Sequence, residues 1–105
     1  MSGPNAIWAK RLKEARLSVG LSQKQLGIQA GLDEFVASTR INRYELGVHK
    51  ADYVIAQKLA RVLQVPTSFF YEENDQLAEI LIITYRLSSK HQRDLLKELK
   101  TKHPQ

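Results

Sequence analysis

With 105 residues the chain has the length of one compact domain, which excludes a catalytic domain with a separate ligand-binding domain. Hydrophobic residues at 43% and charged residues at 26% are ordinary for a soluble globular protein, and the absence of cysteine excludes disulfides, thiolate metal sites and cysteine nucleophiles. No apolar run approaches the length of a membrane span, and the first four residues lack the charge and the apolar stretch of a signal peptide, so we expect a cytoplasmic protein.

The formal net charge of +5 is confined to the first part of the chain. Residues 1–66 hold ten basic and five acidic side chains, whereas residues 67–105 hold six of each. A basic unit joined to a neutral one favours a polyanionic partner for the first unit, because a polyphosphate attracts cations whatever its sequence. A solvated, soluble surface explains the charge equally well, so charge alone leaves both interpretations open.

Glycine and proline separate segments whose apolar residues have helical spacing, and no segment has the alternation of a strand. The first helix is expected over residues 5–19 and ends at a left-handed Gly20. Its buried stripe consists of Trp8, Leu12, Ala15 and Val19. A second helix is expected to begin at the capping box of residues 22–25 and to end at Gly31.

The middle of the chain predicts two more helices and a short turn. A third helix ends at Gly47, and a fourth spans residues 52–64, where Val65-Pro66 closes it because proline cannot continue the hydrogen-bond ladder. The fourth helix is expected to bury Ile55, Leu59, Val62 and Leu63. The aromatic segment 67–71 is expected to form one short helical turn.

The last third of the chain predicts a helical hairpin over residues 74–102. Its first helix begins at Asn74 or Asp75 and carries apolar residues over far more than one face, and its second begins at a capping box made by Ser89 and Gln92. The hairpin covers only part of its own apolar surface, and symmetric pairing with a second copy is the commonest way to cover the rest. The side chains expected in that pairing are Leu77, Ile80, Leu81, Ile82, Ile83, Leu87, Leu95 and Leu99.

Several separated blocks match one known family in order. Residues 11–16, 20–27, 30–32 and 41–47 read RLKEAR, GLSQKQLG, AGL and INRYELG. Together they resemble the helix-turn-helix DNA-binding domain of phage repressors and Cro, also called the XRE family. The resemblance covers about residues 6–72 and implies an all-α, five-helix domain over residues 5–72. The hairpin expected above for dimerisation follows this domain.

The third helix has the two-faced pattern that a recognition helix needs, because one face must be buried while the other enters the major groove. The helical repeat places Ala37, Ile41, Tyr44, Glu45 and Val48 on one side and Thr39, Arg40 and Arg43 on the other. Arginine grips guanine with two hydrogen bonds, and threonine offers a hydroxyl and a methyl for thymine. By the resemblance, the base-reading positions are Ser38, Thr39, Arg40, Asn42 and Arg43. Solvated arginines without a partner are the alternative for Arg40 and Arg43.

The DNA backbone is expected to meet the amino end of the second helix, where free amides favour a phosphate oxygen. The residues expected at phosphates are Ser22, Gln23, Lys24 and Lys50. The resemblance implies the contact of Gln23, and it places Lys50 in a loop that lies against the sugar-phosphate chain. Arg16 and Glu45 are expected, again by the resemblance, to form a structural ion pair between helices one and three.

The chain departs from the family between Gly31 and Ile41, where it has about four residues more than the usual connection. Either the turn is a longer loop with Phe35 packed on the core, or Asp33 caps an earlier start that lengthens helix three by one turn. A similar long connection occurs in some restriction-modification controller proteins. Both accounts make Ser38 the base-reading assignment most at risk.

Catalysis is not supported by the residues. Ser89, His91 and Asp94 lie on one expected helix and cannot line up as nucleophile, base and orienting acid, while His49 and His103 have no metal-ligand spacing. Single-stranded bases stack on exposed aromatic side chains, but an aromatic cluster after a proline turn is far more often part of the core. We therefore expect no enzyme, no cofactor, no metal and no small-molecule ligand.

The sequence thus predicts a homodimeric, sequence-specific regulator of transcription that binds double-stranded DNA. Two recognition helices related by a twofold axis would enter a pseudo-palindromic operator whose half-sites lie about 10 bp apart, or a multiple of that spacing. Repression and activation both remain open. The alternative is an antitoxin or adaptor whose C-terminal hairpin mainly binds a protein partner. Such a chain should be a monomer or a weak dimer when alone.

Overall fold

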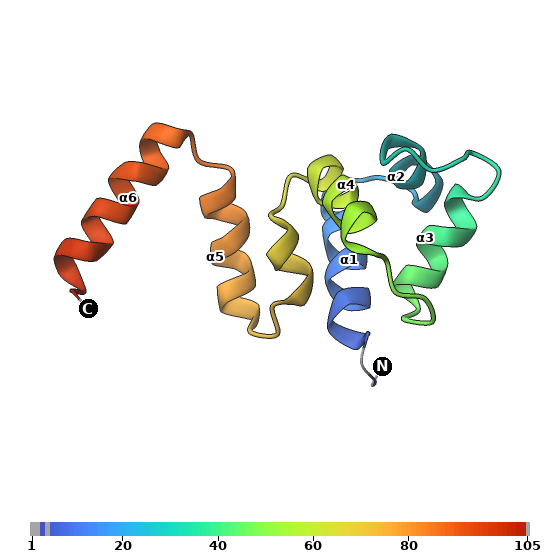
Figure 1. Cartoon of the computed structure of the whole chain (residues 1–105), viewed down its shortest axis with the longest axis horizontal. Coiled ribbons are helices and arrows are strands. Elements are labelled where there is room, and N and C mark those ends of the chain that lie inside the picture. Colours follow the sequence, from blue (N-terminus) through green and yellow to red (C-terminus); the bar gives the residue numbers. More distant parts are fainter. Residues whose placement is uncertain (1–2, 4, 105) are drawn as a thin grey trace.

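The computed structural model describes residue 3 and residues 5–104, and these residues form six α-helices and one 3-10 helix without a strand. The helices are α1 (Ala6–Ser18), α2 (Gln23–Gln29), α3 (Ala37–Glu45), α4 (Tyr53–Leu63), the 3-10 helix η1 (Thr67–Tyr71), α5 (Asp75–Tyr85) and α6 (Ser89–Lys102). In Figure 1, α1 to α4 and η1 form one bundle, with α3 at one end of the long axis and α6 at the other. The all-α prediction is confirmed. None of the described helices has the length and hydropathy of a membrane span.

Local signals place most helix ends where the sequence predicts them. The Gln25 amide donates to Ser22 Oγ at 3.0 Å and the Ser22 amide donates to Gln25 Oε1 at 2.9 Å, so both halves of the predicted capping box are present. Asn74 caps α5 by accepting from the Leu77 amide. The glycines predicted to end the first three helices all have positive φ: Gly20, Gly31 and Gly47.

Two predictions about helix ends are wrong. The cap of α6 is Ser88, whose hydroxyl accepts from the His91 amide, whereas Gln92 donates to the carbonyls of Thr84 and Tyr85, so the predicted Ser89–Gln92 capping box does not form. The predicted buried positions Val19 and Val48 are 41% and 62% exposed. Both lie beyond the ends of α1 and α3, where the backbone no longer follows the helical repeat.

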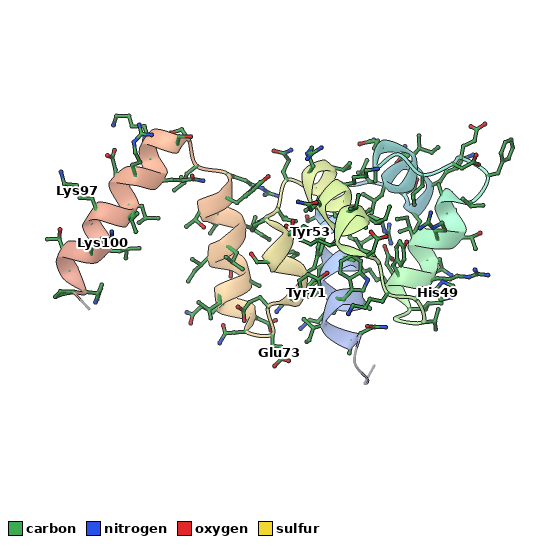
Figure 2. All side chains as sticks on the ribbon, viewed as in Figure 1. His49, Tyr53, Tyr71, Glu73, Lys97 and Lys100 are labelled. Carbon is green, nitrogen blue, oxygen red and sulfur yellow. The ribbon has the colours of Figure 1, made fainter. Side chains whose placement is uncertain are left out.

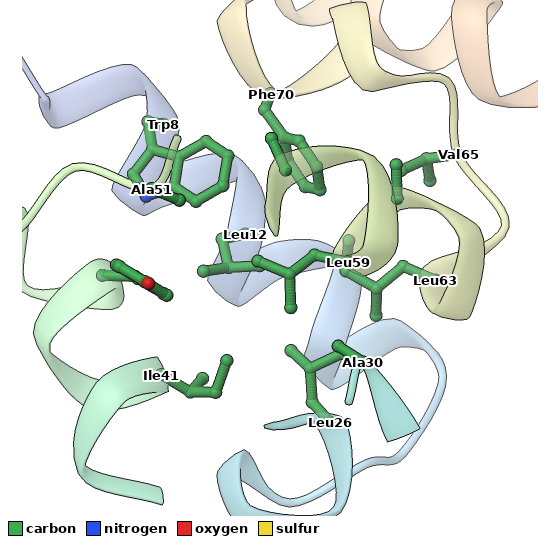
Figure 3. Packing of buried hydrophobic residues seen from close by; sticks show 14 of the residues in the cluster. Trp8, Leu12, Leu26, Ala30, Ile41, Ala51, Leu59, Leu63, Val65 and Phe70 are labelled. Atoms are coloured by element: carbon green, nitrogen blue, oxygen red, sulfur yellow. The ribbon is translucent and has the colours of Figure 1, made fainter. Parts of the chain in front are cut away.

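The core lies between α1, α2, α3, α4 and η1, and Figure 3 shows Trp8, Leu12, Leu59 and Phe70 packed at its centre. The rings of Trp8 and Phe70 meet edge to face with centroids 4.7 Å apart. Since Phe69 and Phe70 are buried, they are core residues of the bundle and cannot stack single-stranded bases. In α4, Leu59 and Leu63 are fully buried as predicted, while Ile55 and Val62 are only partly buried.

Helices α2 and α3 approach most closely at Gly27. A Cβ atom added to Gly27 would lie 2.7 Å from Ala37 Cβ and 3.0 Å from Ala37 Cα, both shorter than van der Waals contact. The glycine therefore sets the distance at which the two helices of the motif cross.

Gly27→Ala is expected to lower the free energy of unfolding by about 1–3 kcal/mol, because the added methyl group forces the backbones of α2 and α3 apart. The loss is expected to outweigh the gain in helix propensity of about 1 kcal/mol. Urea denaturation measures the difference. Gln29→Ala, at an exposed position of the same helix, should change stability by less than about 0.5 kcal/mol. A Gly27→Ala variant as stable as the parent chain would contradict the close crossing.

Buried Arg11 attaches α5 to the bundle, a role that the sequence analysis missed. Its guanidinium donates to the carbonyls of Glu72 and Glu73 at 2.8 and 3.2 Å and forms an ion pair with Asp75 at 2.9 Å. Hydrogen bonds from Lys10 and Arg11 lower the pKa of the Asp75 carboxyl. Ala78 is the one buried side chain of α5 among the described residues. Arginine thus fixes the amino end of α5 on α1.

At its other end, α5 is attached to α4 through Arg86, which donates to the carbonyls of Gln64 and Leu63 at 3.0 and 3.3 Å. Residues 86–88 then connect α5 to α6, in the order that the predicted hairpin requires. The two helices diverge in Figure 1, and no side chain of α6 is buried. An apolar groove with a volume of about 330 Å³ lies between them.

Candidate nucleic-acid interface

Helix α3 presents one buried and one exposed face, as predicted. Ala37 and Ile41 are completely buried, and Tyr44 and Glu45 are nearly so. On the other side of the helix the side chains exposed to solvent are Ser38, Thr39, Asn42 and Arg43. Because α3 lies at the end of the bundle away from α5 and α6, this face is open to a large partner (Figure 1).

The two arginines of α3 are held differently. Arg40 is half-buried: its Nη2 donates to Tyr44 Oη at 2.8 Å, and its guanidinium lies 5.9 Å from the centre of the Tyr44 ring. Arg43 is exposed, and its side chain makes no hydrogen bond or ion pair with the other described residues. Neither arginine is packed inside the bundle. Arg40 is therefore oriented along the helix surface, whereas Arg43 projects freely.

Gln23 connects the amino end of α2 to the exposed face of α3. Its Nε2 donates to Asn42 Oδ1 and to Glu45 Oε1, both at 3.2 Å. A residue predicted to contact phosphate is thus in contact with one predicted to read a base. Ser22 and Lys24 flank Gln23 and are both exposed. The structure therefore brings three of the four predicted phosphate residues to the same edge of α3.

Lys50, the fourth predicted phosphate residue, lies on the loop after α3 and is exposed. Figure 2 shows the preceding residue, His49, beside the carboxyl end of α3. Lys24 is next to Gln23, which contacts Asn42 and Glu45 in the carboxyl half of α3, and Lys50 follows the carboxyl end of the same helix. Both lysines add positive charge to the surroundings of α3.

The predicted ion pair between Arg16 and Glu45 is present and buried. Arg16 Nε donates to Glu45 Oε2 at 2.6 Å and Arg16 Nη2 donates to Glu45 Oε1 at 3.0 Å, in the two-bond geometry that arginine makes with a carboxylate. The Arg16 side chain is 10% exposed and that of Glu45 only 3%. Arg16 Nη1 also donates to the carbonyl of Leu21. The hydrogen bonds that Arg16 donates to Glu45 raise the pKa of Arg16.

Because Glu45 accepts from both Arg16 and Gln23, one carboxylate ties together α1, α2 and α3. The pair fixes the rotation of α3 about its own axis, since Glu45 must face inward for the contact to form. The exposed face of α3 is thereby set by a buried contact on its opposite side.

The long connection before α3 matches neither sequence-based account in full. It is a loop, and α3 begins at Ala37, so helix three is not lengthened. Asp33 does not cap α3, because its Oδ1 accepts from the Phe35 amide at 2.8 Å within the loop. Phe35 does not pack on the core either, since it is 87% exposed. Ser38 consequently lies in the first turn of α3 and on its exposed face.

The comparisons with known proteins all indicate the same family. The helix-turn-helix family model matches residues 12–70. Two curated relatives, from Sinorhizobium medicae (strain WSM419) and Rhizobium meliloti (strain 1021), are named uncharacterised HTH-type transcriptional regulators. Each is 32% identical over 63 residues, which cover 60% of this chain and 42% of the relative. The chain therefore spans about two fifths of the length of these relatives.

A solved structure, that of the transcriptional regulator BswR, resembles nearly the whole fold. It superposes with a TM-score of 0.81 at 40% identity, and the match covers 89% of this chain and 92% of that chain. Since only about a tenth of the chain lies outside the match, the similarity extends beyond the helices of the motif into the C-terminal helices. Since the family model alone matches more than half of the residues, the chain belongs to the XRE-type helix-turn-helix family of transcriptional regulators.

Proposed function

We propose that the protein is a sequence-specific regulator of transcription that binds double-stranded DNA as a homodimer on a pseudo-palindromic operator. The observation that supports the proposal most strongly is the exposed face of α3, whose direction is set by the buried Arg16–Glu45 pair. The major groove admits an α-helix, and this face offers the donors and the methyl group that base edges recognise. The expected base-reading residues are Ser38, Thr39, Arg40, Asn42 and Arg43.

The expected phosphate contacts come from the edges of the same face. Lys24 and Lys50 supply cations, while Ser22 and Gln23 supply hydrogen-bond donors. These contacts would position α3 in the groove without reading sequence. Asp33 and Glu34, in the loop before α3, would repel phosphates, so the proposal requires this loop to lie away from the sugar-phosphate chain.

Lys50→Ala is expected to weaken binding to the operator and to random duplexes by the same factor. It should also reduce the slope of log K against log salt by about one, because one fewer counterion is released. Fluorescence anisotropy over a salt series measures both effects. Lys90→Ala removes the same charge at the opposite end of the molecule, on α6, and should leave the slope unchanged (Figure 1). A Lys50→Ala slope equal to that of the parent chain would remove Lys50 from the contacts.

The homodimer is supported by the apolar surface of α5 and α6. Leu77, Ile80 and Ile83 on α5 are 49%, 48% and 58% exposed, and Leu99 on α6 is 48% exposed. Exposed apolar surfaces of this kind mark an interaction site, and self-pairing is their commonest use in small proteins. Ile82 differs from the other predicted interface residues because it packs against the core.

Ile83→Glu is expected to convert the dimer into a monomer, because the substitution places a charge on the surface that pairs. Light scattering coupled to size-exclusion chromatography measures the mass. Val54→Glu, at a similarly exposed apolar position of α4, serves as the matched control and should remain a dimer. If the Ile83→Glu chain keeps the mass of a dimer, the copies pair through another surface.

The second candidate function is that of an antitoxin or adaptor whose C-terminal helices capture a protein. The open groove between α5 and α6 favours this alternative, since its walls include Leu81, Leu95 and Leu99. Oligomeric state separates the two functions. A stable homodimer of the isolated chain supports the regulator, and a monomer supports the adaptor.

A further inference from the structure

We propose that the leucine stripe of α6, formed by Leu95, Leu96 and Leu99, packs on the outer face of α5 of a second copy. That outer face is formed by Ile80 and Ile83. The inference rests on the homodimer of the proposed function and specifies which surfaces meet. Twofold symmetry makes the contact twice, so that each α5 lies between the α6 of its own chain and that of the other.

Helix α6 has almost no contact with the rest of its own chain. None of its side chains is buried, and Leu96 and Leu99 are 53% and 48% exposed. An isolated helix of this length is marginally stable in water, so its stability must come from packing of its apolar face. The leucine stripe therefore needs a partner that its own chain does not supply.

The direction of α6 is fixed at the corner between the two helices. Gln92 Nε2 donates to the carbonyls of Thr84 and Tyr85 at 2.8 and 3.3 Å, which closes the end of α5 onto the start of α6. Arg86, in the connection, is held by the carbonyls of Leu63 and Gln64 on the bundle. These contacts hold α6 at an angle to α5, with the apolar groove between them.

Helix α5 has two apolar sides, and its own α6 covers neither fully. Leu81 and Tyr85 line the groove that faces α6. Ile80 and Ile83 lie on a different side by the helical repeat and are 48% and 58% exposed. The contacts of Gln92 and Arg86 place α6 on the groove side of α5. The leucines of α6 therefore cannot reach the outer face of the same α5. A second copy supplies both a helix for this outer face and an α5 to enter the groove.

The charges of the two surfaces are complementary. Residues 72–85 hold four acidic side chains and no basic one, whereas α6 holds five basic and two acidic side chains. Asp75 is already paired with Lys10 and Arg11 of α1, which leaves three glutamates of this segment without an ion pair among the described residues. Both acidic residues of α6 are paired within the helix, as Lys90–Asp94 and Glu98–Lys102. The remaining cations, Arg93, Lys97 and Lys100, have i, i+4, i+7 spacing and form one row beside the leucine stripe. Figure 2 shows Lys97 on the side of α6 turned away from α5.

The matching acidic surface begins at Glu79, one residue before Ile80. Glu79 lines a hollow between α1 and α5 in which Arg11 is paired with Glu14 and Asp75, and Glu79 itself makes no ion pair with another described residue. A helix seated on the outer face of α5 with its basic row toward this hollow would pair the two charged surfaces. A second copy of the chain thus offers both the apolar stripe and the charge that the outer face of α5 requires.

Disulfide trapping tests the contact directly, because the chain has no cysteine of its own. Ile83→Cys and Leu96→Cys each replace an exposed side chain, so both variants should fold. Chains of the two variants that differ in length by a tag are mixed and oxidised, and the expected product is a covalent dimer of one chain of each kind. Leu17→Cys, exposed on α1, replaces Ile83→Cys in the control and should give no such product with Leu96→Cys.

Two outcomes would overturn the inference. One is a mixture in which Ile83→Cys crosslinks only to itself, which means that two α5 helices meet without α6. The other is a double variant that forms its disulfide within one chain, which means that α6 folds back on its own α5. If the chain selects a DNA motif but gives no mixed covalent dimer, the proposed function stands and this inference fails. If the mixed dimer is trapped but no DNA motif is selected, this inference stands and the proposed sequence-specific binding fails.

The charge match has its own measurement. Lys97→Glu is expected to raise the dissociation constant of the dimer by about two- to fivefold, the range for an exposed ion pair. Lys58→Glu makes the same change of charge at an exposed position of α4, outside the proposed contact, and should leave the constant unchanged. Sedimentation equilibrium gives both values. Equal dissociation constants for the two variants would mean that the basic row of α6 does not lie beside the acidic residues of α5 in the dimer.

Discussion

Arg16→Ala is expected to lower the free energy of unfolding by about 3–5 kcal/mol, the largest effect of any single substitution considered for this chain. The reason is the charge that remains. The Glu45 side chain is 3% exposed, and after the substitution its carboxylate would be buried with only the weak hydrogen bond from Gln23. Breaking one side of a buried pair is costly because the partner loses both its solvation and its counter-charge.

The same reasoning makes a second comparison informative. If the cost comes from the isolated carboxylate, then replacing both members, as in Arg16→Met with Glu45→Leu, should restore most of the lost stability. Lys13→Ala, at an exposed position of the same helix, should change the unfolding free energy by less than about 0.5 kcal/mol. Urea denaturation measures all three variants. An Arg16→Ala chain as stable as Lys13→Ala would contradict a buried, structural pair.

The pKa of Arg16 determines how this contribution depends on pH. The hydrogen bonds that Arg16 donates to Glu45 raise the pKa of the guanidinium above its ordinary value. A raised pKa stabilises the fold at every pH below the ordinary value, and the stabilisation is lost only as pH rises through the folded value. Titration of Arg16 should therefore make no difference to stability across the neutral range.

Arg43→Ala and Arg40→Ala are each expected to weaken binding to the cognate operator by about 1–3 kcal/mol and to relax base preference at one position of each half-site. Arg43 projects freely from α3, so its guanidinium is available for a guanine edge. Arg40 must keep or exchange its hydrogen bond to Tyr44 Oη as it binds, since that bond uses one of its five donors.

The measurement compares each variant on the selected operator and on random duplexes. When alanine replaces a base-reading residue, affinity falls mainly on the operator, so the ratio of operator affinity to random-duplex affinity decreases. Lys24→Ala serves as the matched control, because a phosphate contact should lose the same factor on both. Equal losses on the two kinds of DNA for both arginine variants would mean that they contact only phosphates.

Helix ends were predictable because their signals are local. The capping box at Ser22 and Gln25 needs only residues three apart, and the glycines that end α1, α2 and α3 act through their own φ. The start of α6 shows the limit of such signals. Ser88 and Ser89 are adjacent and chemically equivalent, and the tertiary contacts of Gln92 with the end of α5 leave Ser88 as the cap.

The contacts that attach α5 were not predictable from charge. Arg11 was counted only as a basic residue, yet it is 2% exposed and binds carbonyls more than sixty positions away. A signal was present, because Arg11 lies one helical turn from both Trp8 and Ala15 and so falls on the buried face of α1. No comparable signal existed for Phe35, whose exposure follows from the turn that Asp33 makes with its own loop.

The residues of the candidate interface were predicted in two ways, from helical periodicity and from the family resemblance. Periodicity alone separated Ile41 and Tyr44 from Thr39 and Arg43, and the structure confirms that division of α3. The Arg16–Glu45 pair came from the family resemblance, since no rule of spacing links positions 29 residues apart. The contact of Gln23 with Asn42 and Glu45 was not anticipated, because it depends on how α2 crosses α3.

Selection of bound sequences from random duplexes tests the central claim, that the exposed face of α3 reads bases. The expected result is an enriched motif with two halves related by a twofold axis and centred about 10 bp apart, or a multiple of that spacing. Repeating the selection with Arg43→Ala should lose preference at one position in each half. A protein that binds DNA but enriches no motif, or enriches the same motif after alanine replaces both arginines, would contradict the account.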